Sequence, residues 1–253
     1  MSALLELDEV WAGYDGSDIL RGLSITVPDG SVTCIVGPNG AGKSTILRVV
    51  SGQLRSRRGS VRFAGQKLTG LTPRQILLKG IVQVAQEHSL FPDMTVRQNV
   101  LMGGFIVRDR ALLDRRLAMV EELFPIVSDR AKEKAGSLSG GQQRLVEFAR
   151  CLMLDPRLVV LDEPSMGLDP RTLRVVMETV RAMGDAGRTV LLVEQNVRAG
   201  LTLAGHAVVL ESGRVRLEGT GKDVLANPEI AHLYLGGTST AESIGAAGRA
   251  QGR

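Results

Sequence analysis

The chain has 253 residues, a net charge of +4 at pH 7, 43% hydrophobic residues and only 3% aromatic residues. This length accommodates one large α/β domain or a domain with a subdomain, and the scarcity of aromatic residues means that its core must be aliphatic. The mild charge, without aromatic residues interleaved among the basic ones, argues against nucleic acid as a partner, and no apolar stretch approaches the roughly 20 residues that span a bilayer.

The N-terminus and the cysteines indicate a cytosolic protein. Residues 1–8 have neither a basic region nor an uninterrupted apolar segment, so they are not expected to form a signal peptide. Cys34 falls in an apolar run and Cys151 in a helical one, and both are predicted to be small buried hydrophobic residues. Two cysteines placed in this way predict neither a disulfide framework nor a zinc site.

The first part of the chain predicts a small antiparallel sheet. Alternating residues at 5–10 and 23–27, and a short run ended by glycine at 61–65, indicate strands. Tyr14 is expected in the connection between the first two strands, within residues 11–14. Its ring is either an ordinary packed aromatic or a platform for a nucleotide base, a stacking interaction of about 1–3 kcal/mol.

The stretch around which the chain is organised is a glycine-rich loop between an apolar strand at 32–36 and a helical segment. It fits the pattern G-x-x-x-x-G-K-S, in which backbone N–H groups and a helix N-terminus surround a phosphate. Lys43 is expected to reach the β- and γ-phosphates and Ser44 to bind Mg²⁺. A glycine-rich turn with an accidental Lys-Ser is the structural alternative. The predicted nucleotide-binding residues are Gly37, Pro38, Asn39, Gly40, Ala41, Gly42, Lys43, Ser44 and Thr45.

The middle of the chain is predicted to be helical. Thr72 is expected as the N-cap and Pro73 as the first residue of one helix, and a strand follows at 81–84. Apolar residues at helical spacing then recur, and no clear strand occurs between about residues 87 and 150. We therefore expect a helical subdomain inserted into the α/β core. Its predicted helices are residues 95–103, 110–124 and 139–154.

The start of the last of these helices predicts a second anion site. Ser139 is expected as its N-cap, and the two glycines after it would let a phosphate approach the exposed N–H groups. An ordinary capped helix is the structural alternative. The predicted site consists of Ser139, Gly140, Gly141 and Gln142.

The α/β core resumes after this helical region. Apolar runs at 158–161 and 189–193 predict central parallel strands. The first run leads into Asp162, which is expected to hold Mg²⁺ through water, and Glu163, which is expected to deprotonate the attacking water. An acidic strand end is the structural alternative. A crossover helix at 171–183, a hairpin at 207–217, a last helix ending near Tyr234 and a disordered tail complete the prediction.

These motifs together resemble the nucleotide-binding subunit of ABC (ATP-binding cassette) transporters over about residues 4–237. The resemblance implies an α/β fold of the P-loop NTPase (RecA-like) type, with a parallel core, an antiparallel β subdomain and an inserted helical subdomain. It also implies an ATP hydrolase with ATP and Mg²⁺ as cofactors. The expected boundaries are 1–85 and 151–237 for the core, 86–150 for the helical subdomain and 238–253 for the tail.

The resemblance also implies roles for matching positions. Residues 37–45 match the Walker A loop, residues 138–142 the signature, and Asp162-Glu163 the Walker B motif. In this family two subunits stack head to tail, and each ATP lies between one Walker A loop and the signature of the other chain. Three further positions match family residues: Gln86 is the Q-loop glutamine, implied to contact the metal and to sense the γ-phosphate, Asp169 belongs to the D-loop, and Tyr14 is the adenine-stacking aromatic.

One position departs from the family pattern. Gln195 stands where the family has a switch histidine, and an amide donates hydrogen bonds but carries no proton or positive charge. This departure and the segment 91–105 resemble the second, smaller ATPase subunit of branched-chain amino-acid importers. The implied partners are a second ATPase subunit, integral membrane permeases and, indirectly, a solute-binding protein. The chain is expected to be peripheral on the inner face of the cell membrane.

Three alternatives follow from the same resemblance. Importers of urea or short amides share these motifs. The ATPase of lipopolysaccharide export is similar around residues 86–96 but has a histidine at the switch position. The rival class is a soluble ABC ATPase of DNA repair or translation, which carries coiled-coil arms, zinc modules or two fused cassettes, whereas this sequence contains one cassette.

Overall fold

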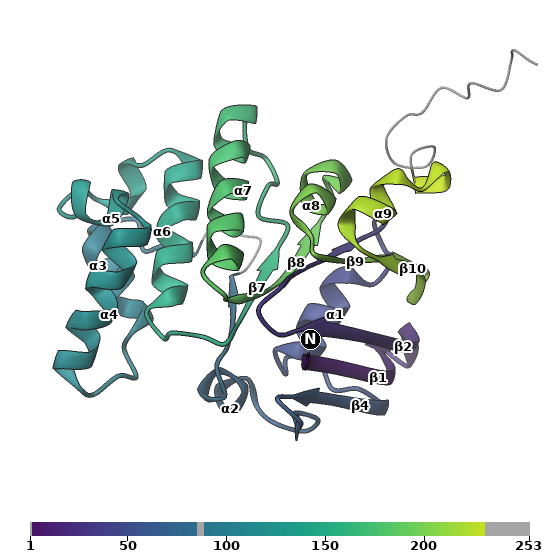
Figure 1. Cartoon of the computed structure of the whole chain (residues 1–253). Coiled ribbons are helices and arrows are strands. Elements are labelled where there is room, and N and C mark those ends of the chain that lie inside the picture. The colour runs from purple at the N-terminus through teal and green to yellow at the C-terminus, as the bar shows by residue number, and fades with distance from the viewer. Residues whose placement is uncertain (1, 85–88, 231–253) are drawn as a thin grey trace, which may run out of the picture.

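The computed structural model describes residues 2–84 and 89–230 of the chain. Within these residues, a four-stranded antiparallel sheet has the order β2-β1-β4-β5, and a six-stranded sheet has the order β10-β9-β3-β8-β7-β6. Figure 1 shows β1, β2 and β4 below β9 and β10 of the larger sheet. The predicted α/β architecture, with an antiparallel sheet attached to a mainly parallel one, is therefore confirmed.

The antiparallel sheet is built from longer strands than the sequence indicates. Residues 11–14, which we predicted to connect two strands, instead belong to the first one. The strand passes through register shifts near Glu9, whose φ is 46°, and this break hides its continuation from the alternation pattern. The strands are β1 (Ala3–Tyr14), β2 (Ser17–Pro28), β4 (Arg58–Phe63) and β5 (Gln66–Lys67).

The central strands of the larger sheet, β3, β7 and β8, are buried on both faces, which explains their continuous apolar runs. Along β8, Val190 and Leu192 join one hydrophobic core, whereas Leu191 and Val193 join the other, because successive side chains point to opposite faces. Among the strands of this sheet that the structure describes, β10 alone pairs in antiparallel fashion, with β9. The strands are β3 (Val32–Val36), β6 (Ile81–Val84), β7 (Leu158–Asp162), β8 (Thr189–Glu194), β9 (His206–Glu211) and β10 (Arg214–Gly219).

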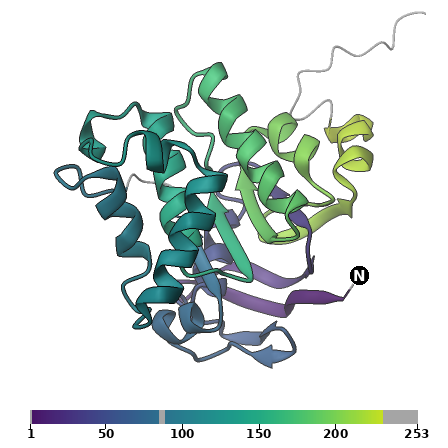
Figure 2. The same ribbon diagram turned by 60° about the vertical axis from the view of Figure 1, so that its left-hand side comes forward.

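The helices between β6 and β7 form one group, which we call the helical lobe. Figures 1 and 2 both show this lobe on the side of the core away from α9 and β10. Its two shortest elements have four and three residues, too few for a periodic signal, and were not predicted. The subdomain boundaries at residues 86 and 150 stay a prediction. The lobe comprises α3 (Val96–Gly103), α4 (Arg110–Leu123), α5 (Ile126–Asp129), η1 (Ala135–Ser137) and α6 (Gly140–Leu152).

The remaining helices flank the larger sheet. Thr72 caps α2 as predicted: its side chain accepts a hydrogen bond from the Gln75 N–H, and Gln75 bonds back to the Thr72 N–H. The predicted end of the last helix near Tyr234 and the predicted tail lie outside the described residues. Within the described part of the chain, no helix is both long and apolar enough to cross a bilayer. These helices are α1 (Lys43–Val50), α2 (Pro73–Leu78), α7 (Pro170–Asp185), α8 (Val197–Leu203) and α9 (Gly221–Ala226).

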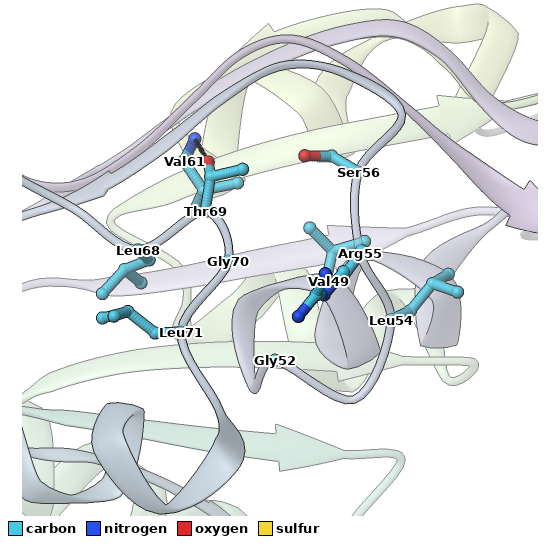
Figure 3. A pocket seen from close by; sticks show the side chains of 10 residues that line it. All are labelled: Val49, Gly52, Leu54, Arg55, Ser56, Val61, Leu68, Thr69, Gly70 and Leu71. Atoms are coloured by element: carbon cyan, nitrogen blue, oxygen red, sulfur yellow. Dashed lines mark hydrogen bonds between the residues drawn. The ribbon is translucent and has the colours of Figure 1, made fainter.

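A small cavity lies where α1 meets the loops around β4 and β5. It measures about 10 Å³ and is lined by residues that include Val49, Arg55 and Leu71. Figure 3 shows Thr69 beside Val61, with the hydrogen bond from the Val61 N–H to the Thr69 hydroxyl at 3.2 Å. A cavity of this volume holds at most one water molecule, so it is a packing defect and no ligand site.

One buried amide organises the entrance to the helical lobe. Asn99 in α3 is fully buried. Its Oδ1 accepts a hydrogen bond from the Phe91 N–H at 2.8 Å, and its Nδ2 donates to the carbonyl oxygens of Phe91, Met94 and Thr95. The segment before α3 is therefore fixed to the helix by polar contacts that water cannot replace.

We predict that Asn99→Ala lowers the free energy of unfolding by about 2–4 kcal/mol, because it leaves several buried backbone groups without partners. Urea unfolding followed by circular dichroism would measure the change. Asn227→Ala serves as the control, since the Asn227 side chain accepts an exposed hydrogen bond from the nearby Glu229 N–H and is not buried as Asn99 is. Equal stabilities of the two variants would contradict the proposed importance of the buried amide.

Candidate functional site

The glycine-rich loop takes a backbone path that side chains would obstruct. A Cβ on Gly37 would lie 2.3 Å from the carbonyl oxygen of Leu210 in β9, so the loop can lie against that strand only with glycine here. Gly42 is the N-cap of α1, with φ 107° in the left-handed region that favours glycine. Because Gly42 has no side chain to cap the helix, the first N–H groups of α1 are available to an anion.

Lys43 is the first residue of α1 and folds back over the loop. Its side chain is only 5% exposed. The ammonium donates hydrogen bonds to the carbonyl oxygens of Gly37 at 2.8 Å and Pro38 at 3.1 Å, and its Nζ lies 3.9 Å from Glu163 Oε1. The loop therefore presents a positive charge beside a carboxylate that the sequence predicts as a base.

Asp162 and Glu163 lie at the carboxyl end of β7, as predicted. Asp162 Oδ1 is buried, and no group among the described residues forms a hydrogen bond with it. Burial, reinforced by the neighbouring Glu163 carboxylate, raises the pKa of Asp162, while Arg48 and Lys43 oppose the rise. A buried carboxylate oxygen without a partner is costly, and a divalent cation is a ligand that satisfies it.

Glu163 has a backbone conformation that is rare for a residue with a side chain. Its φ is 43°, and its N–H donates to the carbonyl oxygen of Val193 at 2.9 Å. Strained residues of this kind gather at functional sites, where the surrounding structure holds them in place. In this conformation the Glu163 carboxylate lies 3.9 Å from the Lys43 ammonium.

Gln195 follows β8 and reaches the phosphate loop. Its Nε2 donates a hydrogen bond to Asn39 Oδ1 at 3.4 Å, across 156 positions of sequence. The next residue, Asn196, caps α8 by accepting a hydrogen bond from the Ala199 N–H. At the position where the family pattern has a histidine, the group that contacts the phosphate loop is therefore an amide, which does not titrate.

Tyr14 at the end of β1 is held by a residue that we did not predict. The Arg48 guanidinium donates a hydrogen bond to the Tyr14 hydroxyl at 2.8 Å, and its Cζ lies 5.7 Å from the centre of the ring. An arginine at this distance interacts with the π-system as well as with the hydroxyl. Arg48 carries no motif signal, because an arginine five positions after Lys43 looks like an ordinary exposed helical residue.

The signature segment forms a separate corner of the molecule. Ser139 caps α6 as predicted: its Oγ accepts from the Gln142 N–H at 3.4 Å, and Gln142 Oε1 accepts from the Ser139 N–H at 3.0 Å. A Cβ on Gly141 would lie 1.9 Å from Cγ2 of Thr172 in α7. Glycine is therefore needed here for the approach of two helices, a reason that the sequence did not suggest.

Asp169 caps the helix against which the signature packs. Its Oδ1 accepts hydrogen bonds from the N–H groups of Arg171 at 3.0 Å and Thr172 at 3.2 Å, and the hydrogen bonds from Thr172 lower its pKa. Together with Ser139, Gly141 and Gln142, it lines a hollow of about 430 Å³. The residues that match the signature and the residue that matches the D-loop therefore line the same hollow.

The predicted site residues therefore fall into two groups. The first group lies around the phosphate loop, where the Lys43 ammonium is beside the Glu163 carboxylate. In the same group, the Gln195 amide donates a hydrogen bond to Asn39. The other group lines the hollow between α6 and α7. Gln86, predicted to contact the metal and the γ-phosphate, lies outside the described residues.

We did not predict a role for Glu194 and Ser165, which form a part-buried hydrogen-bonded pair near Gln195. An acidic residue at the end of an otherwise apolar strand is a usable signal, since it singled out Asp162 on β7. The same pattern occurs on β8, an apolar strand that ends in Glu194.

Comparison with known proteins identifies the architecture. Residues 20–166 match the family model described as "ABC transporter". The chain is 38% identical to the high-affinity branched-chain amino acid transport ATP-binding protein BraG of Pseudomonas aeruginosa, over 92% of this chain and 100% of that protein. It is 30% identical to BraF of the same organism, over 92% of this chain and 98% of that protein.

A solved structure agrees with these matches. The ADP conformation of an ATP-binding cassette of an ABC transporter superposes with a TM-score of 0.81 at 30% identity, covering 94% of this chain and 100% of that one. The phosphate loop, the strained carboxylate beside it and the distant signature corner therefore have one explanation: the chain belongs to the ABC transporter family and is its ATP-binding, ATP-hydrolysing subunit.

Proposed function

We propose that this chain is the smaller of two unlike ATPase subunits of an importer for branched-chain amino acids or related small polar solutes. The observation that carries the chemistry is the meeting of Lys43 and Glu163 at the phosphate loop, 3.9 Å apart. The solute class is supported by the descriptions of BraG and BraF, which are both branched-chain amino acid transport ATP-binding proteins. The choice of subunit is supported by the higher identity to BraG than to BraF, 38% against 30%.

In this proposal each residue around the loop has a distinct task. The loop N–H groups and the Lys43 ammonium bind the β- and γ-phosphates, and Tyr14, held by Arg48, stacks on the adenine. The Glu163 carboxylate orients a water molecule and accepts its proton as the water oxygen attacks the γ-phosphorus. The bond from that phosphorus to the bridging oxygen breaks, which leaves ADP and phosphate.

The metal site is proposed from the donor set. Asp162 Oδ1 needs a partner, and the Ser44 hydroxyl, next to Lys43 at the start of α1, is exposed. Hard oxygen donors of this kind suit Mg²⁺. The ion, when bound, neutralises charge on the phosphates. Gln86 is proposed as a further ligand.

The second group of site residues is proposed to act on the nucleotide of another subunit. The capped N-terminus of α6 and Asp169 line a hollow of their own, of about 430 Å³, which supports a role outside this chain's own phosphate loop. Ser139, Gly140, Gly141 and Gln142 would then complete the partner's site, as the family resemblance implies. The helical subdomain of residues 86–150 presents them to the partner.

A membrane-embedded partner is proposed to dock on an apolar hollow of about 490 Å³ between α2 and the end of α3. Leu78 is 55% exposed and Phe105 is 72% exposed on its rim, although large apolar side chains seldom remain so accessible. The hollow also includes Gln83, the last but one residue of β6, which leads into residue 86. Binding there would tie the permease to the chain beside its ATPase site and keep it on the inner face of the membrane.

We predict that two substitutions separate binding from hydrolysis. Lys43→Ala should weaken MgATP binding at least about tenfold, because a charged donor to the phosphates is lost. Glu163→Gln should bind MgATP normally but hydrolyse it about 10²–10⁴-fold more slowly. Isothermal titration and a phosphate-release assay measure the two effects. Near wild-type hydrolysis by Glu163→Gln would remove Glu163 from the role of base.

We predict that Phe105→Glu abolishes co-purification with integral membrane subunits, because it places a charge in an apolar contact. ATP binding by the isolated chain should be unchanged, since Phe105 has no part in the phosphate loop. Met119→Glu is the matched control: Met119 is also an exposed apolar residue, and it is not among the residues that line the hollow. Equal loss of co-purification in both variants would argue against this hollow as the docking site.

We predict that the working unit is a heterodimer with unequal sites, because the Gln195 amide cannot carry the proton of a switch histidine. Gln195→Ala should therefore reduce transport modestly, whereas replacing the switch histidine of the partner ATPase should nearly abolish it. Transport in reconstituted vesicles measures both. A purified homodimer of this chain that hydrolyses ATP as fast as the full transporter, and stops on Gln195→Ala, would contradict the asymmetry.

A further inference from the structure

A fully buried carboxylate lies between the two loops that carry Glu163 and Gln195. Glu194 is the last residue of β8 and is 0% exposed. Its Oε1 accepts a hydrogen bond from the Ser165 N–H at 3.0 Å. Its Oε2 accepts from the Ser165 hydroxyl at 2.6 Å and from the N–H groups of Gln195 at 3.1 Å and Asn196 at 3.3 Å.

The partners of this carboxylate are all donors, so they favour its ionised form. Three of the four are backbone N–H groups that cannot accept, so a protonated Glu194 could donate only to the Ser165 hydroxyl and would lose the hydrogen bond that this hydroxyl donates to it. Burial raises the pKa of Glu194, and the hydrogen bonds from Ser165, Asn196 and Gln195 counteract the rise. A buried charge is tolerated here because four hydrogen bonds replace its hydration.

The packing around Glu194 allows little adjustment. A Cβ on Gly200 of α8 would lie 3.1 Å from Glu194 Cβ and 2.7 Å from Cys34 Sγ in β3. Cys34 is the titratable group that β3 contributes here, and burial followed by the charge of Glu194 raises its thiol pKa well above the ordinary value. The thiol therefore stays protonated where Glu194 titrates.

We propose that Glu194 is a positioning residue that fastens the loop of Glu163 to the end of β8, and that Ser165 is the partner through which it acts. Ser165 lies two residues beyond Glu163 in the same loop, and Gln195 follows Glu194 directly. One carboxylate thereby sets the placement of both residues relative to the phosphate loop. This inference rests on the proposed roles of Glu163 and Gln195 in hydrolysis.

The test is Ser165→Ala, which removes only the hydroxyl and leaves the backbone bonds to Glu194. We expect kcat for MgATP to fall roughly tenfold, the rate equivalent of one lost hydrogen bond to a charged group, with KM within about twofold. Ser165→Thr keeps a hydroxyl and should restore kcat. Ser31→Ala is the matched control, because the Ser31 hydroxyl donates a 2.7 Å bond to the Pro28 carbonyl oxygen at the far end of β3 from the phosphate loop.

The pH profile gives a readout that a merely structural role would not move. Hydrolysis should need ionised Glu194 and be lost as the pH falls through its raised pKa. Ser165→Ala removes a bond that lowers this pKa, so the acid limb of kcat should shift to higher pH. Ser31→Ala should leave the limb in place.

Two results would overturn the proposal, and both are distinguishable from failure of the proposed function. In the first, Ser165→Ala has wild-type kcat and an unmoved acid limb, while a Glu163→Gln variant measured beside it has lost hydrolysis. This would show that hydrolysis does not need the hydrogen bond from the Ser165 hydroxyl to Glu194. Loss of MgATP binding together with kcat would show a structural role only. Full activity of Glu163→Gln would instead refute the proposed role of Glu163 as base.

Discussion

A lysine ammonium that is 5% exposed has to be surrounded by oxygen atoms, because a buried charge without partners costs several kcal/mol. The loop meets this requirement with its own carbonyl oxygens, those of Gly37 and Pro38. That arrangement is possible only because Gly37 lies against β9 and Gly42 turns the chain into α1. The strand that delivers the loop must in turn be rigid, and β3 is buried along its whole length.

The larger sheet transmits this rigidity to the rest of the site. Asp162 ends β7, Glu194 ends β8, and both strands run parallel to β3, so the carboxyl ends of neighbouring strands meet at one edge. Open α/β sheets place ligands outside this edge as a rule. The two hydrophobic cores, one on each face of the sheet, hold the strands in register, and the polar residues proposed to act on the nucleotide lie at the edge.

Much of the fold and of the geometry of the glycine-rich loop was predictable because it is local. Thr72 and Ser139 cap helices through residues three positions away, and the glycines around Lys43 follow from one short pattern. The hydrogen bonds that the sequence could not reveal join side chains far apart along the chain: Arg48 with Tyr14, Gln195 with Asn39, and Glu194 with Ser165. Register decides these pairs, and one bulge near Glu9 was enough to hide the end of β1.

The contact between Gly141 and Thr172 has a mechanical consequence. It joins the helical lobe, through α6, to α7 beside the larger sheet, with no space left even for a methyl group. Because packed atoms cannot overlap, α6 cannot approach α7 more closely at this point. A relative movement of the two helices here would have to separate them or slide one along the other, and their shortest separation depends on the absence of a side chain at Gly141.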